Sequence, residues 1–254
     1  MELNYKVFGD VGEDIIIIHG LLGSLDNFQT IAKQLSETYR VWLLDMRNHG
    51  RSFHSEEMNY EVMVEDVHEF MKSNQLAHAH LIGHSMGGKV AMNFALTYPE
   101  LVNDLIIIDI GPKKYEGDHQ VILKTMKDIS LNDFSERSEI EEKISEKIHS
   151  QKIVQLMMKN LGRDQNTFFW KPNVEVILKN YRLLMDTMPK HQIFNGKTVF
   201  IKGENSEYIE LDELEDFRKY FSEAQMMIVP NSGHWVHADQ PEVFLQLLFK
   251  ILNN

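Results

Sequence analysis

The chain has 254 residues, of which 43% are hydrophobic and 25% charged, and this length fits one large α/β domain with an insertion better than two catalytic domains. A net charge of −12 argues against a nucleic-acid partner, and the absence of cysteine excludes disulfides, a thiol nucleophile and thiolate metal ligands. No apolar run approaches the ~20 residues of a membrane helix, and residues 1–7 do not resemble a secretory signal, so we expect a cytoplasmic protein without a membrane partner.

Short apolar runs rich in β-branched residues alternate with longer amphipathic segments along most of the chain. This alternation predicts a mainly parallel sheet covered by helices on both faces. Leu3 to Phe8, followed by Gly9 and Gly12, could add an antiparallel edge hairpin. The expected strands are Ile15–Ile18, Val41–Leu44, Leu105–Ile108, Thr198–Ile201 and Met226–Val229, with a further run at Ala79–Ile82. The expected helices lie around Phe28–Tyr39, Tyr60–Ser73, Gly87–Tyr98, Leu211–Phe221 and Pro241–Leu252.

The alternation stops after Gly111-Pro112, and from about Tyr115 to Lys190 the sequence shows only helical periodicity. We therefore expect a helical lid at residues 113–190, inserted between core segments 1–112 and 191–254. Its apolar faces could cover the carboxyl edge of the sheet, where open α/β folds bind ligands, or could pack against one another.

The pentapeptide Gly83-His84-Ser85-Met86-Gly87 lies between a strand-like and a helix-like run. The pattern G-x-S-x-G in this context is typical of a nucleophile elbow, in which a serine occupies a strained strand-to-helix turn. Ser85 is therefore the expected nucleophile. The same stretch also matches the start of a phosphate-binding loop, but Val90 stands where such a loop needs a hydroxyl, so we disfavour nucleotide hydrolysis.

A serine nucleophile needs a base and donors for the oxyanion. The base is predicted to be His234, in the loop Asn231–Trp235 after the last strand, ahead of His237. The loop His19–Gly23 after the first core strand would supply the backbone N–H of Leu21, and Met86, directly after the nucleophile, would supply the second oxyanion donor.

The acid is the unusual member of this set. Its common place, after the strand Thr198–Ile201, holds Ser206, which carries no negative charge. Asp109 ends the strand Leu105–Ile108, where an ionised carboxylate would need a partner such as His234. We favour Asp109 over Glu204 and Glu207, although Asp109 could instead cap the following loop.

Two further groups of polar residues are assigned structural roles. The loop Asp45–Ser52 has mixed charges that indicate an internally hydrogen-bonded loop at the base of the site. His78, His80 and His84 lack carboxylates at metal-ligand spacing, so no metal site is expected.

In this order, the motifs HGLLG, DMRNHGRS, GHSMGG, LIIIDIGP and SGHW resemble those of the α/β-hydrolase superfamily over essentially the whole chain, and most closely the small bacterial esterases of the YbfF type. The resemblance implies a mostly parallel eight-stranded sheet and an inserted lid. It also implies carboxylesterase activity, with the triad Ser85, Asp109 and His234.

We therefore expect a cofactor-independent serine carboxylesterase that hydrolyses short to medium acyl esters, a small-molecule substrate, through an acyl-enzyme on Ser85. An acyl-CoA thioesterase or a carbon–carbon bond hydrolase with the same triad is the alternative among enzymes. A ligand-binding receptor on a hydrolase fold is the alternative without catalysis. The sequence leaves the substrate-binding residues open, together with the choice between monomer and homodimer.

Overall fold

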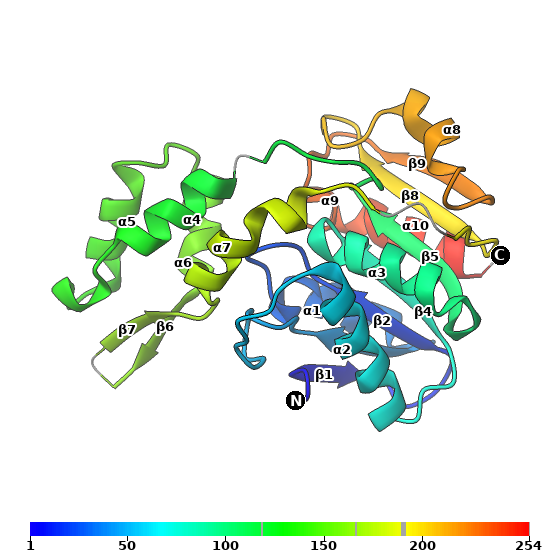
Figure 1. Ribbon diagram of the computed structural model, residues 1–254, viewed down its shortest axis with the longest axis horizontal. Coiled ribbons are helices and arrows are strands. Elements are labelled where there is room, and N and C mark those ends of the chain that lie inside the picture. The colour runs from blue at the N-terminus through cyan, green and yellow to red at the C-terminus, as the bar shows by residue number, and fades with distance from the viewer. Residues whose placement is uncertain (118, 166, 189–191, 254) are drawn as a thin grey trace.

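The computed structural model describes residues 1–117, 119–165, 167–188 and 192–253. Within them, one seven-stranded sheet has the order β1-β3-β2-β4-β5-β8-β9 (Figure 1). All neighbours pair in parallel except β1 and β3, which are antiparallel. The strands are β1 (Tyr5–Phe8), β2 (Asp14–Ile18), β3 (Arg40–Leu44), β4 (Ala79–His84), β5 (Val102–Ile108), β8 (Thr198–Gly203) and β9 (Ala224–Val229).

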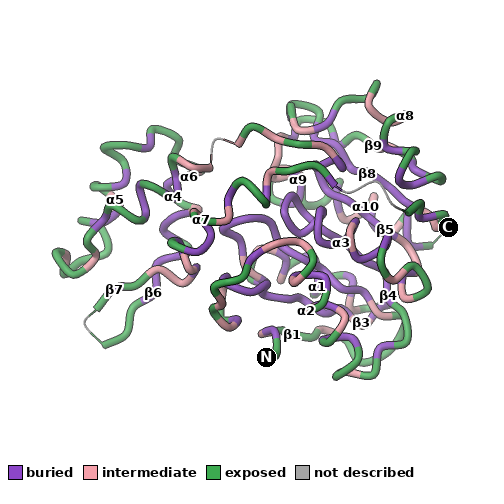
Figure 2. Tube along the Cα trace, viewed as in Figure 1, coloured by how far each residue is buried: buried purple, intermediate pink, exposed green. Residues whose placement is uncertain are grey.

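The central strands are buried on both faces, which explains their continuous apolar sequences. In β2, Ile15 and Ile17 belong to one apolar cluster with α1 and α10, whereas Ile16 and Ile18 belong to a second cluster with α2 and α3. The sheet therefore separates two helical layers, and its central strands are buried (purple in Figure 2). The helices of the core are α1 (Gln29–Leu35), α2 (Tyr60–Ser73), α3 (Met86–Thr97), α8 (Leu214–Phe217), α9 (Val236–Asp239) and α10 (Pro241–Leu252), with 3₁₀ turns η1 (Leu25–Phe28), η2 (Pro99–Leu101) and η4 (Leu211–Glu213).

The prediction of eight strands in the main sheet is wrong for the described residues, because the chain before β2 holds only the single strand β1 and a turn. The expected edge hairpin is also corrected. β1 is an antiparallel edge strand, but it pairs with β3 rather than with its sequence neighbour β2. The turn packs against the chain entering β3: a Cβ added at Gly12 would lie 2.0 Å from the Thr38 carbonyl oxygen. The turn thus lies beside the start of β3, the strand that separates β1 at the outer edge from β2.

The segment between β5 and β8, here called the insertion, projects from one end of the sheet (Figure 1). In it α4 packs against α6 and α7, and α5 packs against α6. Buried Ile122, Met126, Ile140 and Ile144 belong to the same apolar cluster as the α2–α3 side of the sheet, so packing within the insertion continues into the core. Its elements are α4 (His119–Asp128), η3 (Leu131–Asp133), α5 (Arg137–Ser145), α6 (Gln151–Lys159), β6 (Leu161–Asp164), β7 (Thr167–Trp170) and α7 (Val174–Met185).

The expectation of an insertion without strands is wrong. β6 and β7 form an antiparallel hairpin, with Leu161 opposite Trp170. The run Thr167-Phe168-Phe169-Trp170 consists of residue types that favour strands, and Gln165 adopts a left-handed φ of 49° at the turn. The predicted boundary at residues 190 and 191 lies outside the described part of the chain. None of the helices that the structure describes is long and apolar enough to cross a membrane.

Candidate active site

Ser85 lies at the turn between β4 and α3 and has the strained backbone conformation φ 52°, ψ −117°. The turn is tight enough to require glycine on both sides. A Cβ added at Gly83 would lie 2.3 Å from the Gly87 carbonyl oxygen, and one added at Gly87 would lie 2.4 Å from the Ile18 carbonyl oxygen. The Ser85 N–H donates to the Ile108 carbonyl at 3.1 Å, which fixes the turn to the end of β5. These contacts explain the G-x-S-x-G pattern.

Asp109 directly follows β5 and is completely buried. Its Oδ2 accepts a hydrogen bond from His234 Nδ1 at 2.8 Å, and its Oδ1 accepts one from the Gly203 N–H at 3.0 Å. The Ser206 hydroxyl donates to the same Oδ2. Three donors therefore satisfy a buried carboxylate that would otherwise be costly to desolvate. The structure brings together the two residues that sequence reasoning paired as acid and base.

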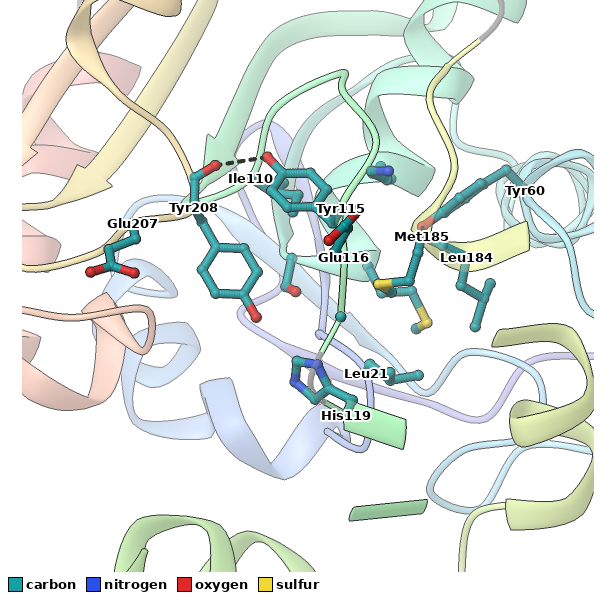
Figure 3. Close-up of a pocket in the computed structure, with 14 residues that line it drawn as sticks. Leu21, Tyr60, Ile110, Tyr115, Glu116, His119, Leu184, Met185, Glu207 and Tyr208 are labelled. Atoms are coloured by element: carbon teal, nitrogen blue, oxygen red, sulfur yellow. Dashed lines mark hydrogen bonds between the residues drawn. The ribbon is translucent and has the colours of Figure 1, made fainter. Parts of the chain in front are cut away.

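The competing carboxylates are placed differently. Glu204 is exposed, and its carboxylate accepts from the Asn231 N–H at 2.8 Å. Glu207 is exposed and is one of the residues that line a cavity (Figure 3). Ser206, which stands where an acid is more common, contacts Asp109 instead of replacing it. Sequence reasoning dismissed Ser206 for lacking charge and missed its role as a hydrogen-bond donor.

Leu21 and Met86, the expected oxyanion donors, line the same cavity as Ser85. Met86 is the first residue of α3, so its N–H has no acceptor within the helix. Leu21 follows Gly20, where an added Cβ would lie 3.2 Å from the Ser85 Cβ, so this loop touches the nucleophile. Leu21 and Ser85 line the same two cavities.

His19 ties the oxyanion loop, residues 19–23, to the rest of the core. Its Nε2 accepts the Met46 N–H at 3.0 Å, an arrangement that leaves the proton on Nδ1, which lies 2.8 Å from the Gly20 carbonyl oxygen. Burial lowers the pKa of His19. A neutral imidazole therefore bridges the loop after β2 and the loop after β3.

His84 and His237 surround His234. The rings of His84 and His234 lie 4.7 Å apart between centroids, and His84 Nε2 lies 2.9 Å from the His234 carbonyl oxygen, which identifies this nitrogen as the donor. Burial lowers the pKa of His84 well below its usual value, and it lowers the pKa of His237 to about 3. Both neighbours are therefore uncharged near neutral pH. They add no positive charge beside the imidazole that has to accept a proton.

A cavity of about 190 Å³ opens at Ser85 (Figure 3). The ring of Tyr208 stacks on His234, with 3.7 Å between ring centroids, and forms part of the cavity wall. The Tyr115 hydroxyl accepts from the Gly111 N–H and donates to the Tyr208 carbonyl. Sequence reasoning found neither tyrosine, because neither lies in a recognisable motif. The remaining lining residues are Leu21, Tyr60, Met86, Lys89, Ile110, Glu116, Gly117, His119, Leu184, Met185 and Glu207.

Lys89 is a buried lysine on α3, one turn after the nucleophile. Its Nζ donates to the carbonyls of Lys113 and Asp186, which lie near the two ends of the insertion. It also lies 5.0 Å from the centre of the Tyr115 ring and 5.8 Å from that of Tyr60. Burial lowers its pKa to about 8. These contacts show why the partial phosphate-loop match is misleading: the lysine holds the backbone of the insertion.

The loop Asp45–Ser52 is internally hydrogen-bonded, as predicted. The Asp45 carboxylate accepts the N–H groups of Leu25 and Arg51 at 2.7 and 2.9 Å. The Arg47 guanidinium forms a two-point ion pair with Asp66 on α2. Among the residues that the structure describes, no group of three or more His, Asp or Glu side chains is arranged to hold a metal ion.

An α/β-hydrolase profile matches residues 15–241 of this chain. An esterase from a marine microorganism has a TM-score of 0.96 and 38% sequence identity, over 98% of this chain and 99% of its own. A Haemophilus influenzae protein provisionally named esterase/lipase is 38% identical, over 99% of this chain and 88% of its own length. The esterase YbfF of Escherichia coli is 30% identical, over 94% and 93%.

These comparisons establish that the chain belongs to the α/β-hydrolase family and is an enzyme of the hydrolase class. The fold class and the resemblance to YbfF-type esterases, both inferred from the motifs, are confirmed.

Proposed function

We propose that this protein is a serine carboxylesterase in which Ser85 is the nucleophile, His234 the base and Asp109 the acid. The observation that carries the proposal is the 2.8 Å hydrogen bond between His234 Nδ1 and a buried carboxylate. Since Nδ1 donates to Asp109, Nε2 is the nitrogen left to accept a proton. Ser85 and His234 both line a small cavity of about 20 Å³, and this proximity supports a proton transfer between them.

In the first half of the reaction, Ser85 Oγ attacks the ester carbonyl carbon while its proton passes to His234. The carbonyl oxygen becomes an anion, and the N–H groups of Leu21 and Met86 stabilise it; one such donor contributes about 2.7–4 kcal/mol to transition-state binding. The tetrahedral intermediate collapses, the alcohol leaves with the proton from His234, and an acyl-enzyme remains. Water then attacks the acyl carbon as His234 takes one of its protons; the bond to Ser85 Oγ breaks, His234 returns the proton to this oxygen, and the carboxylic acid leaves.

The cavity at Ser85 supports esters with short to medium acyl groups. Its volume of about 190 Å³ is small beside the roughly 300–1,000 Å³ of drug-sized ligand sites. Its wall includes Ile110, Leu184 and Met185, which suit an apolar chain. The names of the esterase relatives support an ester substrate. Oligomeric state and a cytoplasmic location stay predictions from the sequence.

The test combines a fluorophosphonate probe with a panel of substrates. The probe should label Ser85, located by mass spectrometry, and p-nitrophenyl esters of short acids should be turned over. Ser85→Ala should abolish labelling and lower kcat by about 10⁴–10⁶-fold without changing the circular dichroism spectrum. Acyl-CoA thioesters and vinylogous diketones in the same panel separate the two other hydrolase activities. Labelling at another residue, or full ester turnover by Ser85→Ala, would refute the proposal.

A further inference from the structure

Asn160 links the insertion to the oxyanion loop. It is the residue directly after α6 and is 4% exposed. Its Nδ2 donates to the Leu22 carbonyl at 2.7 Å and to the Leu156 carbonyl, on its own helix, at 2.9 Å. Its own carbonyl accepts the Lys171 N–H at 2.9 Å, so the β7 side of the hairpin holds Asn160 in place. The side-chain amide is thus fixed by the insertion and directed at the core.

The acceptor of this bond is a strained residue. Leu22 has a φ of 57°, in the left-handed region that costs a non-glycine residue of order 1–3 kcal/mol, and the surroundings must hold it there. The Asn160 amide gives the Leu22 carbonyl a buried side-chain donor. Leu21, the proposed oxyanion donor, is the residue immediately before it. A change in the backbone of Leu22 therefore moves the Leu21 N–H.

The other end of α6 reaches the loop that carries the base. Lys152 Nζ lies 2.7 Å from Asp239 Oδ1, and Asp239 Oδ2 accepts the Gly233 N–H, next to His234, at 2.9 Å. This second contact is more exposed than the first, since the Lys152 side chain is 66% accessible, and solvent weakens such pairs. Helix α6 therefore spans the site, with its stronger contact at the oxyanion loop.

We propose that Asn160 is a positioning residue that holds the oxyanion loop in its catalytic conformation. Through Asn160, this conformation depends on α6 being packed in the position seen here. The inference rests on the proposed function. With α6 displaced, the Leu22 carbonyl loses its buried donor, Leu22 can leave the left-handed region, and the Leu21 N–H no longer faces the reacting carbonyl oxygen. The insertion then controls transition-state stabilisation as well as access to the cavity.

Asn160→Leu tests this directly, because it keeps the approximate size of the side chain and removes the donor. The matched control is Asn180→Leu: Asn180 is also in the insertion, and its Nδ2 donates only to the Val176 carbonyl of its own helix. Outright loss of an oxyanion donor costs about 10²–10³-fold, and a displaced amide retains part of its effect. We expect Asn160→Leu to lower kcat about 10- to 100-fold with little change in KM, and Asn180→Leu to stay within about twofold.

A trifluoromethyl ketone inhibitor supplies the readout that a merely structural role would not move. Ser85 Oγ adds to the ketone carbon, the serine proton passes to His234, and the ketone oxygen becomes an anion that occupies the oxyanion site. Its affinity should fall by the same factor as kcat in Asn160→Leu. All rates are referred to active sites counted with the fluorophosphonate probe, so that misfolded protein does not enter the comparison.

Asn160→Asp adds a reversible test. The introduced carboxylate cannot donate to the Leu22 carbonyl, but its protonated form can, so the rate relative to Asn160→Leu should recover as the pH falls. The charged groups beside this position, Asp26, Lys159 and Lys171, are the same in both variants, so the ratio of the two rates isolates the effect of the introduced carboxyl group.

The outcomes separate this inference from the proposed function. An inactive wild-type protein, or one not labelled at Ser85, would remove the proposed function itself. If the wild type is active, the positioning role alone would be overturned by two variants that behave alike. Asn160→Leu and Asn180→Leu would then have the same kcat per labelled site and the same inhibitor affinity. A rise in KM with kcat unchanged would also overturn it, because that pattern indicates lost substrate binding rather than lost oxyanion stabilisation.

Discussion

The sheet core and the insertion contribute to the candidate active site in different ways. The core supplies the proposed chemical groups from segments that follow its strands: Ser85 and Asp109 come directly after β4 and β5, and Leu21 and His234 lie in the loops after β2 and β9. The insertion supplies cavity walls, among them Tyr115 and further lining residues His119, Leu184 and Met185. The reacting groups therefore lie on the sheet core, the most regular part of the molecule. Much of the cavity wall comes from the insertion, the least regular part.

The register of the sheet explains this division. Ile108 is paired with His84 on one side and with Ile201 on the other, so the residues that follow these strands are held at the same edge. The Asp109 N–H continues this pairing by donating to the Ile201 carbonyl at 2.9 Å. The insertion has no comparable frame, since its helices pack through side chains. Catalytic geometry should therefore resist changes in the insertion that alter the choice of substrate, apart from changes at the contact of Asn160.

The largest expected loss of activity in this comparison follows replacement of Asp109, the proposed acid in the core. Asp109→Asn should lower kcat by on the order of 10³–10⁴-fold, because an amide no longer selects the histidine tautomer or stabilises the imidazolium. Glu204→Gln, the matched control on the neighbouring loop, should stay within about threefold, since its partner is the exposed Asn231 N–H. Steady-state kinetics with a p-nitrophenyl ester measures both. A loss at Glu204 with Asp109→Asn active would contradict the assignment of the acid.

The acid also shows how far sequence alone reaches. Asp109 could be proposed because an ionisable group after four apolar strand residues needs a buried partner, and His234 was available. The contribution of Ser206 could not be predicted, because it depends on the β8 loop bringing a hydroxyl to a carboxylate 97 residues away in sequence. Local patterns indicate which groups end a strand, but they do not indicate which loops meet above it.

A second prediction compares the packing of the two regions. Ile82 in β4 and Ile144 in α5 are both completely buried, so each replacement by Ala should lower the free energy of unfolding by about 2–5 kcal/mol. One apolar cluster extends from the sheet into the insertion, and we therefore expect a single unfolding transition in both variants. Urea unfolding followed by fluorescence and circular dichroism measures this. An early separate transition in Ile144→Ala alone would show that the insertion unfolds independently of the core.

The insertion was the part least predictable from sequence. Its helices α4 and α7 have apolar faces at helical spacing, which reveals that they are helices but not what they cover. The β6–β7 hairpin was not predicted, because each strand has only four residues, too few for an alternating pattern to be recognised. The cavity-lining residues were left open for the same reason: they come from turns and helix ends whose positions depend on tertiary packing.

The smallest expected effect concerns Lys89, where the core holds both ends of the insertion. Its pKa is lowered by burial from 10.5 to about 8, so between these values the unfolded chain binds the proton that the folded protein has lost. The free energy of unfolding should therefore rise with pH in this window, by at most about 1.4 kcal/mol per pH unit. Burial raises the pKa of the neighbouring Tyr60 and Tyr115, so both stay protonated when folded and titrate only in the unfolded chain, near pH 10.

The measurement is urea unfolding at pH values from 8 to 9.5. Lys89→Met should remove most of the rise, although it should also be less stable overall, because the Lys113 and Asp186 carbonyls lose their donor. Lys33→Met, on the exposed side of α1, should keep the wild-type slope. Equal slopes in all three proteins would show that Lys89 keeps its proton throughout. The contact of Lys89 with the insertion would then involve a charged ammonium group over this whole pH range.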